Sequence, residues 1–177
     1  MEKRIRIFFR EKLLRKIKPS EERVRSHMIK ARHNLKAAEI NKTNNLNDWS
    51  IIASYYAAYH SALSLLVKVG ILSKSHEATI MFLEEFFVKK GKLRKTYLEN
   101  LQKLAKAKEE ILLEEGEIRK IKLLKSRRIT AQYGVSTSFD SEIVNDCINA
   151  AREIILEMES LSERLDEKMV DKIRRSF

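Results

Sequence analysis

The chain has 177 residues, four glycines, one proline, one cysteine and a net charge of +11 at pH 7. So few turn-forming residues exclude a fold rich in β-hairpins, and the abundance of Leu, Lys, Glu, Ala and Ile favours helices. The single cysteine, Cys147, excludes an internal disulfide and fits a reducing compartment, so we expect a cytoplasmic protein. Because Cys147 lies at an apolar spacing, we interpret it as a small buried hydrophobic residue rather than a nucleophile.

Two helices are predicted in the first quarter of the chain. Residues 3–18 form a basic helix that Pro19 stops, and its apolar side chains cover a broad arc that could pack on the bundle, on a second subunit or on an anionic surface. Ser20 then caps a second helix, with two glutamates in its first turn, that runs to the Asn/Thr-rich break at 41–45.

The next predicted helix is the most apolar stretch of the chain. Asn47 or Asp48 caps it, and it runs to Gly70. Its residues 51–72 are the best candidate for a membrane span, but they contain a histidine, a lysine and several serines. Polar and small residues gather on one side, which favours a buried bundle helix and no transmembrane segment.

Turn and cap residues divide the remaining chain. Ser73 or Ser75 starts a helix that Gly91 ends as the residue after the C-cap. A further helix spans about 94–114, and Gly116 interrupts or bends it.

The fifth element of the bundle, not counting the basic helix at 3–18, spans 117–132, and Ser138 or Asp140 caps a last long helix. We therefore expect an all-α fold, an up-and-down antiparallel bundle of four to six helices. Residues 1–19 are a basic N-terminal extension, and residues 20–177 are a single bundle domain.

The positive charge is concentrated in two segments. Residues 1–18 contain eight Lys or Arg against two Glu, and residues 119–128 contain six Lys or Arg and no acid. This distribution permits a phosphate-rich partner, and it equally fits solvated helix faces on a highly charged protein.

One arginine in the second segment is out of place. On a helical wheel Arg128 falls among apolar residues, whereas Arg127 falls on the solvated side. An inward guanidinium requires a structural salt bridge, a snorkelling position at the edge of the bundle, or a phosphate in a cleft. Tyr133 follows closely, and its ring could stack on a base, donate to a phosphate or cap the core.

The second candidate group lies on the apolar helix. Tyr55, Tyr56 and Tyr59 share one face, and His60 lies at its edge. His76 follows the Ser75 start signal and could be near the mouth of a cleft. Three tyrosines so close together indicate a hydrogen-bonding seam, although a histidine in such a place is most often a packing residue.

Motifs for cofactor chemistry are missing from the sequence. No set of His, Cys, Asp and Glu has metal-ligand spacing, and there is no glycine-rich phosphate loop or nucleophile elbow. We therefore expect no cofactor and no metal.

Five segments follow one another along the chain: "ARHNLKAAEI", "DWSIIASYYAAYHSALSLLVKVGI", "SKSHEATIMFLEEFFVKKGKL", "RRITAQYGV" and "NDCINAAREIILEM". Together they resemble the HEPN domain, and more narrowly its small archaeal and bacterial branch. The resemblance covers roughly residues 24–160, and the order and spacing of these segments together carry it.

This resemblance implies a helical bundle that pairs into a homodimer with a cleft at the interface. Many relatives are encoded beside a minimal nucleotidyltransferase as toxin–antitoxin-like pairs, and others are metal-independent ribonucleases with Arg, four to six residues, then His. By position Arg128 matches the motif arginine, and Tyr133 stands where the histidine would be. A tyrosine with a pKa near 10 is a poor base at pH 7, which puts ribonuclease activity in doubt.

Three functions are therefore carried forward. In the first, the bundle binds nucleotide or RNA and pairs with a nucleotidyltransferase. In the second, Arg128 works with a histidine, His60 or His76, in a ribonuclease. In the third, the protein is a non-catalytic interaction adaptor. The expected binding residues are Lys125, Arg127, Arg128, Tyr133, Tyr56, Tyr59 and His76.

Overall fold

The computed structural model describes the backbone of residues 3–125 and 140–177, and the side chains of residues 3–112 and 140–177. Within these ranges the chain is helical apart from a two-stranded sheet. The elements are α1 (Lys3–Arg10), β1 (Leu14–Lys16), α2 (Glu21–Thr43), α3 (Asn47–Lys68), β2 (Ile71–Ser73), α4 (His76–Leu83), the π-helix η1 (Glu84–Val88), α5 (Lys95–Lys125), α6 (Ser141–Arg164) and α7 (Glu167–Arg174).

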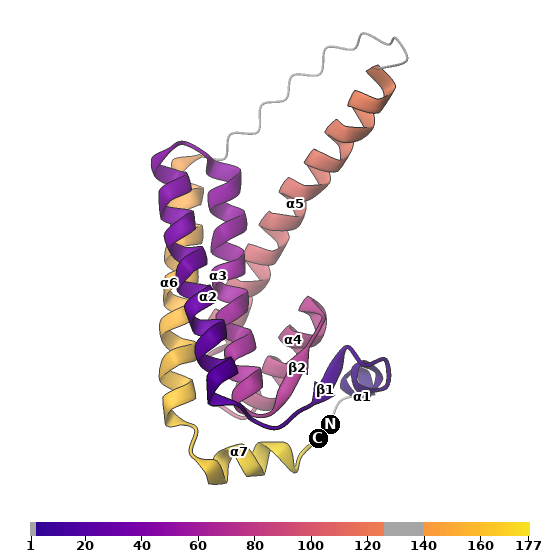
Figure 1. The fold of residues 1–177 in the computed structure, drawn as a ribbon, viewed down its shortest axis with the longest axis vertical. Helices are drawn as coiled ribbons and strands as arrows, with labels where there is room; N and C mark the ends of the chain where they lie inside the picture. Colours follow the sequence, from indigo (N-terminus) through magenta and orange to yellow (C-terminus); the bar gives the residue numbers. More distant parts are fainter. Residues whose placement is uncertain (1–2, 126–139) are drawn as a thin grey trace.

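Four long helices, α2, α3, α5 and α6, alternate in direction along the chain (Figure 1). This arrangement confirms the predicted all-α, up-and-down bundle. Towards its C-terminal end α5 leans away from the other three helices (Figure 1).

The centre of the bundle is α3, in which 15 of 22 residues are buried. Its small residues let α2 approach closely: the Ser50 hydroxyl donates to the carbonyl of Ala38 at 2.8 Å, and Ser64 contacts the Met28 sulfur at 3.0 Å. The interpretation of this stretch as a buried bundle helix is therefore confirmed up to Lys68, whereas Ile71 and Leu72 belong to β2. Among the helices described, none combines the length and apolar character that a membrane span requires.

The predicted helix over residues 3–18 is wrong in its second half, because α1 ends at Arg10. Lys12 adopts a left-handed conformation with φ of 58°. The Leu13 amide donates to the Phe8 carbonyl at 2.9 Å and the Lys12 amide to that of Phe9 at 3.1 Å, which is a Schellman ending. Since glycine normally occupies the left-handed position, a lysine there gives little warning in the sequence.

After this turn the chain forms β1, which pairs antiparallel with β2 in the register Leu14 to Ser73. We call α1 and β1 together, residues 3–16, the N-terminal unit. Ile5 and Phe8 bury one face of α1, and α1 packs on α4. The C-terminal end of the chain seals the same region, where Phe177 stacks on Phe9 with ring centroids 5.9 Å apart.

The helix boundaries further along are partly as predicted. Ser20 caps α2, Ser75 caps α4 and Asp140 caps α6, each through a side-chain oxygen that accepts a backbone amide. Gly91, with φ of 65°, follows the ending of η1 as expected. The N-cap of α3 is Leu46, without a side-chain bond, so neither predicted cap, Asn47 or Asp48, fills that position.

The largest boundary error concerns α5. Gly116 does not interrupt a helix there, and the two elements predicted at 94–114 and 117–132 form one helix over Lys95–Lys125, with residues 126–132 outside the described residues. A glycine inside a helix costs only about 1 kcal/mol relative to alanine, which a long helix tolerates. A short helix, α7, also follows α6 after a break at which Asp166 accepts the Met169 amide at 2.7 Å.

Candidate functional site

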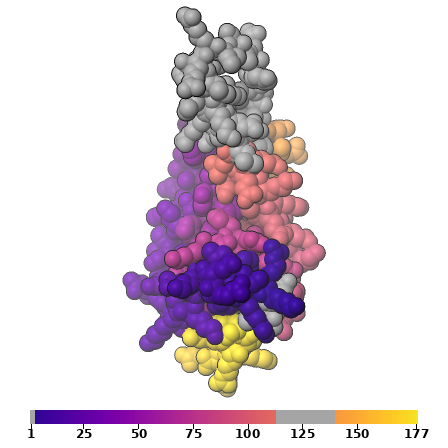
Figure 2. Space-filling view, turned by 90° about the vertical axis from the view of Figure 1, so that its right-hand side faces the viewer, coloured from indigo at the N-terminus to yellow at the C-terminus, as the bar shows by residue number. Residues whose placement is uncertain are grey.

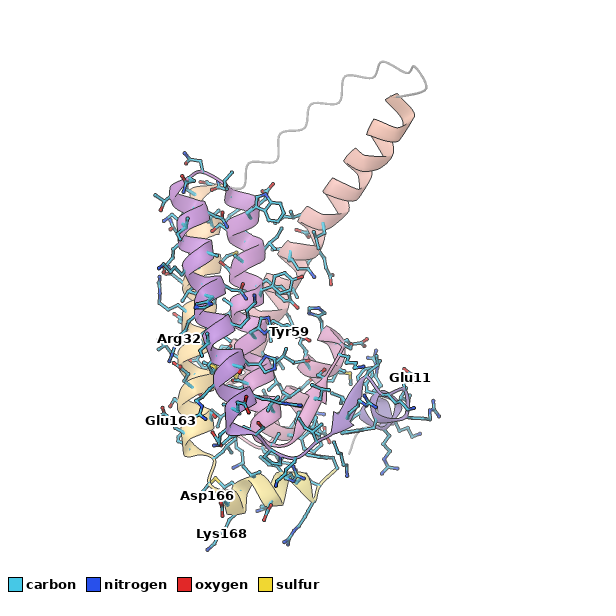
Figure 3. All side chains as sticks on the ribbon, in the orientation of Figure 1. Glu11, Arg32, Tyr59, Glu163, Asp166 and Lys168 are labelled. Carbon is cyan, nitrogen blue, oxygen red and sulfur yellow. The ribbon has the colours of Figure 1, made fainter. Side chains whose placement is uncertain are left out.

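A cluster of tyrosine and histidine rings joins α3 to the start of α4. Tyr55 is 1% exposed, and its hydroxyl is hydrogen-bonded to Nδ1 of His76. The Tyr59 ring stacks on the His76 imidazole at 4.3 Å and on the Tyr55 ring at 5.8 Å, at the centre of the cluster (Figure 3). The Tyr55 hydroxyl therefore has a hydrogen-bond partner inside the protein, as a buried tyrosine requires.

The cap of α4 places His76 in this cluster. Ser75 caps the helix, so His76 is its first residue and Thr79 lies one turn later. The Thr79 hydroxyl oxygen lies 3.4 Å from the Tyr59 hydroxyl and 2.8 Å from that of Ser73. A chain of hydroxyl groups therefore connects the tyrosines to β2 and fixes the entry of the chain into α4.

A buried lysine adds a positive charge to the cluster. Lys108 on α5 is 8% exposed, and its Nζ lies 4.9 Å from the centre of the Tyr55 ring, a cation–π contact. Burial, and next the charge of Lys108, lower the pKa of His76, although Glu109 acts in the opposite direction. The imidazole of His76 is therefore neutral at pH 7 and can accept a proton.

The cluster borders a cavity of about 440 Å³ between α1, α4 and α5. His76 lines it together with Glu77, Glu84 and Glu109, and Arg4, which also lines it, pairs with Glu77 at 2.5 Å. Three carboxylates facing one paired arginine disfavour a phosphate in this cavity.

His60 belongs to a different contact. Its Nδ1 lies 3.2 Å from Nδ1 of His27 on α2, so the N–H of one ring donates a hydrogen bond to the bare nitrogen of the other. Burial, followed by the nearby His27 and Lys30, lowers the pKa of His60 to about 4, and burial with Arg23 lowers that of His27. Both rings are neutral at pH 7.

His60 is also part of the exposed side of α3, which we call the α3 stripe: Trp49, Ala53, Tyr56 and His60. These residues recur at helical spacing, so they lie on one face over three turns. Trp49 is 54% exposed and Tyr56 37% exposed. The stripe contains no charged residue at pH 7, which is unusual on a surface so rich in lysine and arginine.

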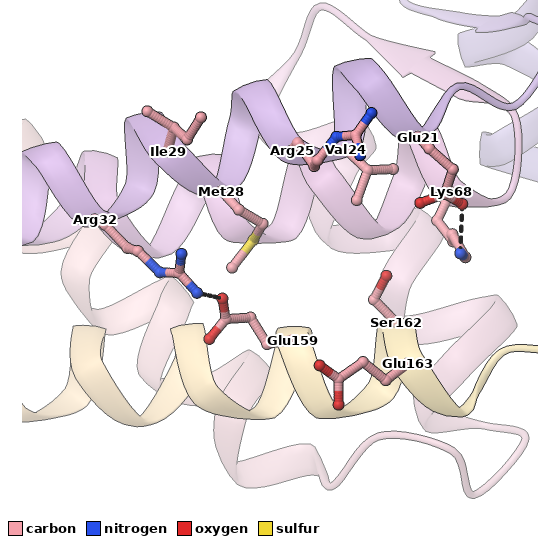
Figure 4. Close-up of a pocket in the computed structure, with 10 residues that line it drawn as sticks. All are labelled: Glu21, Val24, Arg25, Met28, Ile29, Arg32, Lys68, Glu159, Ser162 and Glu163. Atoms are coloured by element: carbon pink, nitrogen blue, oxygen red, sulfur yellow. Dashed lines mark hydrogen bonds and ion pairs between the residues drawn. The ribbon is translucent and has the colours of Figure 1, made fainter.

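A groove of about 410 Å³ lies between α2 and α6 (Figure 4). Met28 and Val24 form its apolar floor. Two of its three cations are paired, Arg32 with Glu159 and Lys68 with Glu21 at 2.5 Å. The third, Arg25, is offset by a third carboxylate, Glu163, so the lining has no net charge and is poorly suited to an anionic ligand.

The structure separates the residues predicted for the site. Tyr59 and His76 meet in the buried cluster, Tyr56 lies on the exposed stripe, and His60 turns towards α2. Lys125 ends α5, about 25 Å along the helix axis from Lys108, and its side chain is outside the described set. Arg127, Arg128 and Tyr133 lie outside the described residues.

Sequence reasoning missed two members of these contacts, Lys108 and His27. Lys108 was visible in principle, because it falls on the buried face of α5 with Leu101, Leu104 and Ile111. His27 gave no signal, since only the packing of α2 on α3 brings it to His60.

Cys147 lies in the partly buried groove between α5 and α6. Burial, and then the nearby Asp146, raise the pKa of its thiol to about 11. The thiol is therefore protonated at pH 7, which agrees with its interpretation as a packing residue. Within the described ranges, no three His, Cys, Asp or Glu side chains are placed to hold a metal ion.

The fold and these contacts define an all-α bundle with a histidine-rich aromatic seam along its central helix. The chain belongs to the HEPN domain family, whose model matches residues 24–161 and so covers most of the sequence. The match confirms the resemblance seen in the five sequence segments.

A curated relative from Methanocaldococcus jannaschii carries the name "Putative toxin MJ0605". It is 34% identical over 67 residues, which are 38% of this chain and 50% of that protein. The match therefore spans half the length of that relative.

Proposed function

We propose that the protein is a HEPN-type RNA-binding bundle that holds bases on the α3 stripe and phosphates on the basic segment at 119–128. The observation that carries this proposal is the uncharged aromatic stripe on a chain with a net charge of +11. The start of α3 and the end of α5 lie at the same end of the molecule (Figure 1). Stacking surfaces beside cations are the usual means of binding single-stranded nucleic acid.

The tyrosines have different parts in this proposal. Tyr56 and Trp49 have exposed rings on which a base can stack. Tyr59 is 9% exposed and lies between Tyr55 and His76, so its role is to hold α4 rather than to touch RNA. His76 likewise acts through the cluster, because the cavity beside it is acidic.

The resemblance assigns the phosphate contact to Arg128, assisted by Arg127 and Lys125. A guanidinium matches a phosphate through paired N–H donors, which lysine cannot reproduce. Tyr133 stacks on the ligand, orients it or accepts a transferred nucleotide.

A homodimer completes the proposed cleft. An uncharged stripe flanked by charged residues is suited to the border of an interface between copies, where its rings face the cleft and are not covered by the partner. In a two-fold dimer the stripe of each copy lies near that of its partner, and the cleft contains both.

The decisive test is the affinity of Arg128→Ala for labelled single-stranded polyuridine, measured by fluorescence anisotropy. We expect affinity to fall at least tenfold while the circular dichroism spectrum and the Tm stay unchanged. Lys36→Ala is the matched control, since Lys36 is exposed on α2 and has no ion pair among the described residues. A lower Tm with unchanged affinity would instead identify Arg128 as a structural ion pair in an adaptor.

A ribonuclease is the second candidate, and His60 favours it. The imidazole is neutral at pH 7 and lies on the stripe beside Tyr56. A pKa of about 4 makes it a weaker base than free imidazole, so slow cleavage is expected. Cleavage of RNA in EDTA that disappears in both Arg128→Ala and His60→Ala would establish catalysis, whereas intact RNA at high protein concentration would leave binding alone.

A toxin-like role follows from the family and from the name of the relative. We propose that a nucleotidyltransferase-type partner restrains the protein. Induced expression in a bacterial host should slow growth, and Arg128→Ala should relieve the effect. Growth arrest that persists in Arg128→Ala would contradict this role for the RNA-binding site.

A further inference from the structure

A second cationic surface lies at the opposite end of the molecule from Lys125, the last residue of α5 (Figure 1). Residues 3–18 contain eight lysines and arginines, and the acid among them is Glu11, at the α1–β1 turn (Figure 3). The N-terminal unit that carries most of them lies over the lower part of the face seen in Figure 2.

Two of these cations are bonded to other parts of the chain. Arg4 pairs with Glu77 at 2.5 Å, and the Lys16 ammonium donates to the Phe177 carbonyl at 2.5 Å. The other six are exposed and have no ion pair among the described residues. We call these six the basic face: Lys3, Arg6, Arg10, Lys12, Arg15 and Lys18.

The basic face is part of a rigid structure rather than a tail. Lys3, Arg6 and Arg10 lie on one side of α1, opposite the buried Ile5 and Phe8. Arg15 lies on β1, which its pairing with β2 holds in place. The cations are therefore held together in the folded protein, and their mutual repulsion persists unless an anion lies over them.

Two more exposed cations border this surface. The end of α7 reaches β1, where the Arg174 guanidinium donates to the carbonyl of Ile17 at 3.1 Å. Lys172 and Arg175, on either side of Arg174, are exposed.

We infer that the basic face is a second nucleic-acid contact surface, which binds the phosphate backbone of an RNA held at the α3 stripe. This inference rests on the proposed function, because it names where the same RNA continues. An anionic membrane is the competing partner for a basic helix. A helix that binds a membrane inserts its apolar face into the lipid. In α1 that face is already covered, because Ile5 and Phe8 pack against the protein, and Ile7, at 38% exposed, is the large apolar side chain of α1 that remains at the surface.

The geometry sets a length requirement. Arg4 and Ala105 line the same cavity, and Lys125 lies twenty residues further along α5, which is about 30 Å. A mononucleotide cannot touch both ends, whereas a long single strand can. Binding of a long strand should therefore be stronger through the second contact, and binding of a mononucleotide should not respond to it.

The test compares two triple variants with equal charge. Arg6→Gln/Arg10→Gln/Arg15→Gln removes half of the basic face. The control variant, Arg25→Gln/Lys36→Gln/Lys103→Gln, removes three exposed cations of α2 and α5 that have no ion pair among the described residues. The probes are labelled long polyuridine, uridine monophosphate, and vesicles containing phosphatidylserine, with salt varied from about 50 to 200 mM.

We expect the first variant to lose polyuridine affinity about tenfold and the salt slope to fall by about 2, since each phosphate contact to a single strand contributes about 0.7. Monophosphate binding should stay the same, and the control variant should change the slope by less than about half as much. Equal losses in both variants, or loss confined to the vesicles, would overturn the inference while leaving RNA binding at the stripe intact. Absence of polyuridine binding by the unmodified protein would overturn both proposals.

Discussion

Tyr55 and Tyr56 are neighbours in the sequence but belong to two different regions of the molecule. Tyr55 is buried, bonded to His76 and covered by the Lys108 ammonium. Tyr56 is 37% exposed on the α3 stripe. A polar aromatic ring that is buried and hydrogen-bonded, such as that of Tyr55, stabilises the fold. Where an aromatic ring stays exposed on an otherwise buried helix, it is available for binding.

The largest expected effect separates these two tyrosines. Tyr55→Ala should lower the free energy of unfolding by about 3 to 5 kcal/mol, because it leaves a cavity and an unpartnered His76. Tyr56→Ala should lower it by only about 1 kcal/mol, because its ring is 37% exposed and contacts Tyr55 edge-on at 5.2 Å, yet it should weaken RNA binding by about 1 to 3 kcal/mol. Urea denaturation and fluorescence anisotropy measure the two effects, and equal destabilisation by both substitutions would contradict the division.

Two glycines test how tightly the structural region is packed. Gly70 and Gly91 have similar positive φ values of 74° and 65°. A Cβ at Gly70 would lie 2.7 Å from the Ile17 carbonyl oxygen and would displace the Arg174 guanidinium, whereas nothing lies within 4 Å of one at Gly91.

Both alanine substitutions introduce backbone strain of about 1 kcal/mol, and Gly70→Ala adds a clash. We expect losses of about 2 to 4 kcal/mol for Gly70→Ala and about 1 kcal/mol for Gly91→Ala in denaturant titrations. Gly91→Ala is the matched control. An equal loss of unfolding free energy in both variants would show that the β1–β2 region shifts to make room for the added methyl group at little cost.

The stripe can be tested through pH. The folded protein keeps His60 neutral down to a pKa of about 4, whereas the unfolded chain binds a proton near pH 6.5. The unfolded state therefore gains protons first, and the free energy of unfolding should fall as pH drops from about 6.5 to about 4. With solvent screening the loss is of the order of 1 kcal/mol.

His60→Gln should flatten this part of the stability curve, measured by urea denaturation at each pH. His33→Gln is the control, since His33 is exposed on α2. An unchanged slope in His60→Gln would place the titrating group elsewhere.

The smallest effect concerns the turn that ends α1. Lys12 occupies a left-handed position, so Lys12→Gly should relieve strain and raise the free energy of unfolding by less than about 1 kcal/mol. Thermal unfolding measures the change, with Lys18→Gly as a control at an exposed position without this constraint. A lower Tm for Lys12→Gly would mean that the side chain itself stabilises the turn.

Much of the fold was visible in the sequence because helix signals are local. Ser20, Ser75 and Asp140 cap helices as expected, and Gly91 follows an ending as expected. The errors arose where a local rule has a permitted exception. Lys12 ends a helix without glycine, and Gly116 lies inside a helix without breaking it.

Composition, spacing and family resemblance thus determined an all-α HEPN bundle and drew attention to the tyrosines of α3. Which tyrosine is buried, which histidine meets which partner, and that Lys108 lies against an aromatic ring were decided by tertiary packing alone. The physical reason is the sequence separation over which each kind of interaction acts. Caps and periodicity act within one or two turns, whereas His27 and His60 are 33 residues apart and Tyr55 and His76 are 21 apart, so only the docking of whole helices brings them together.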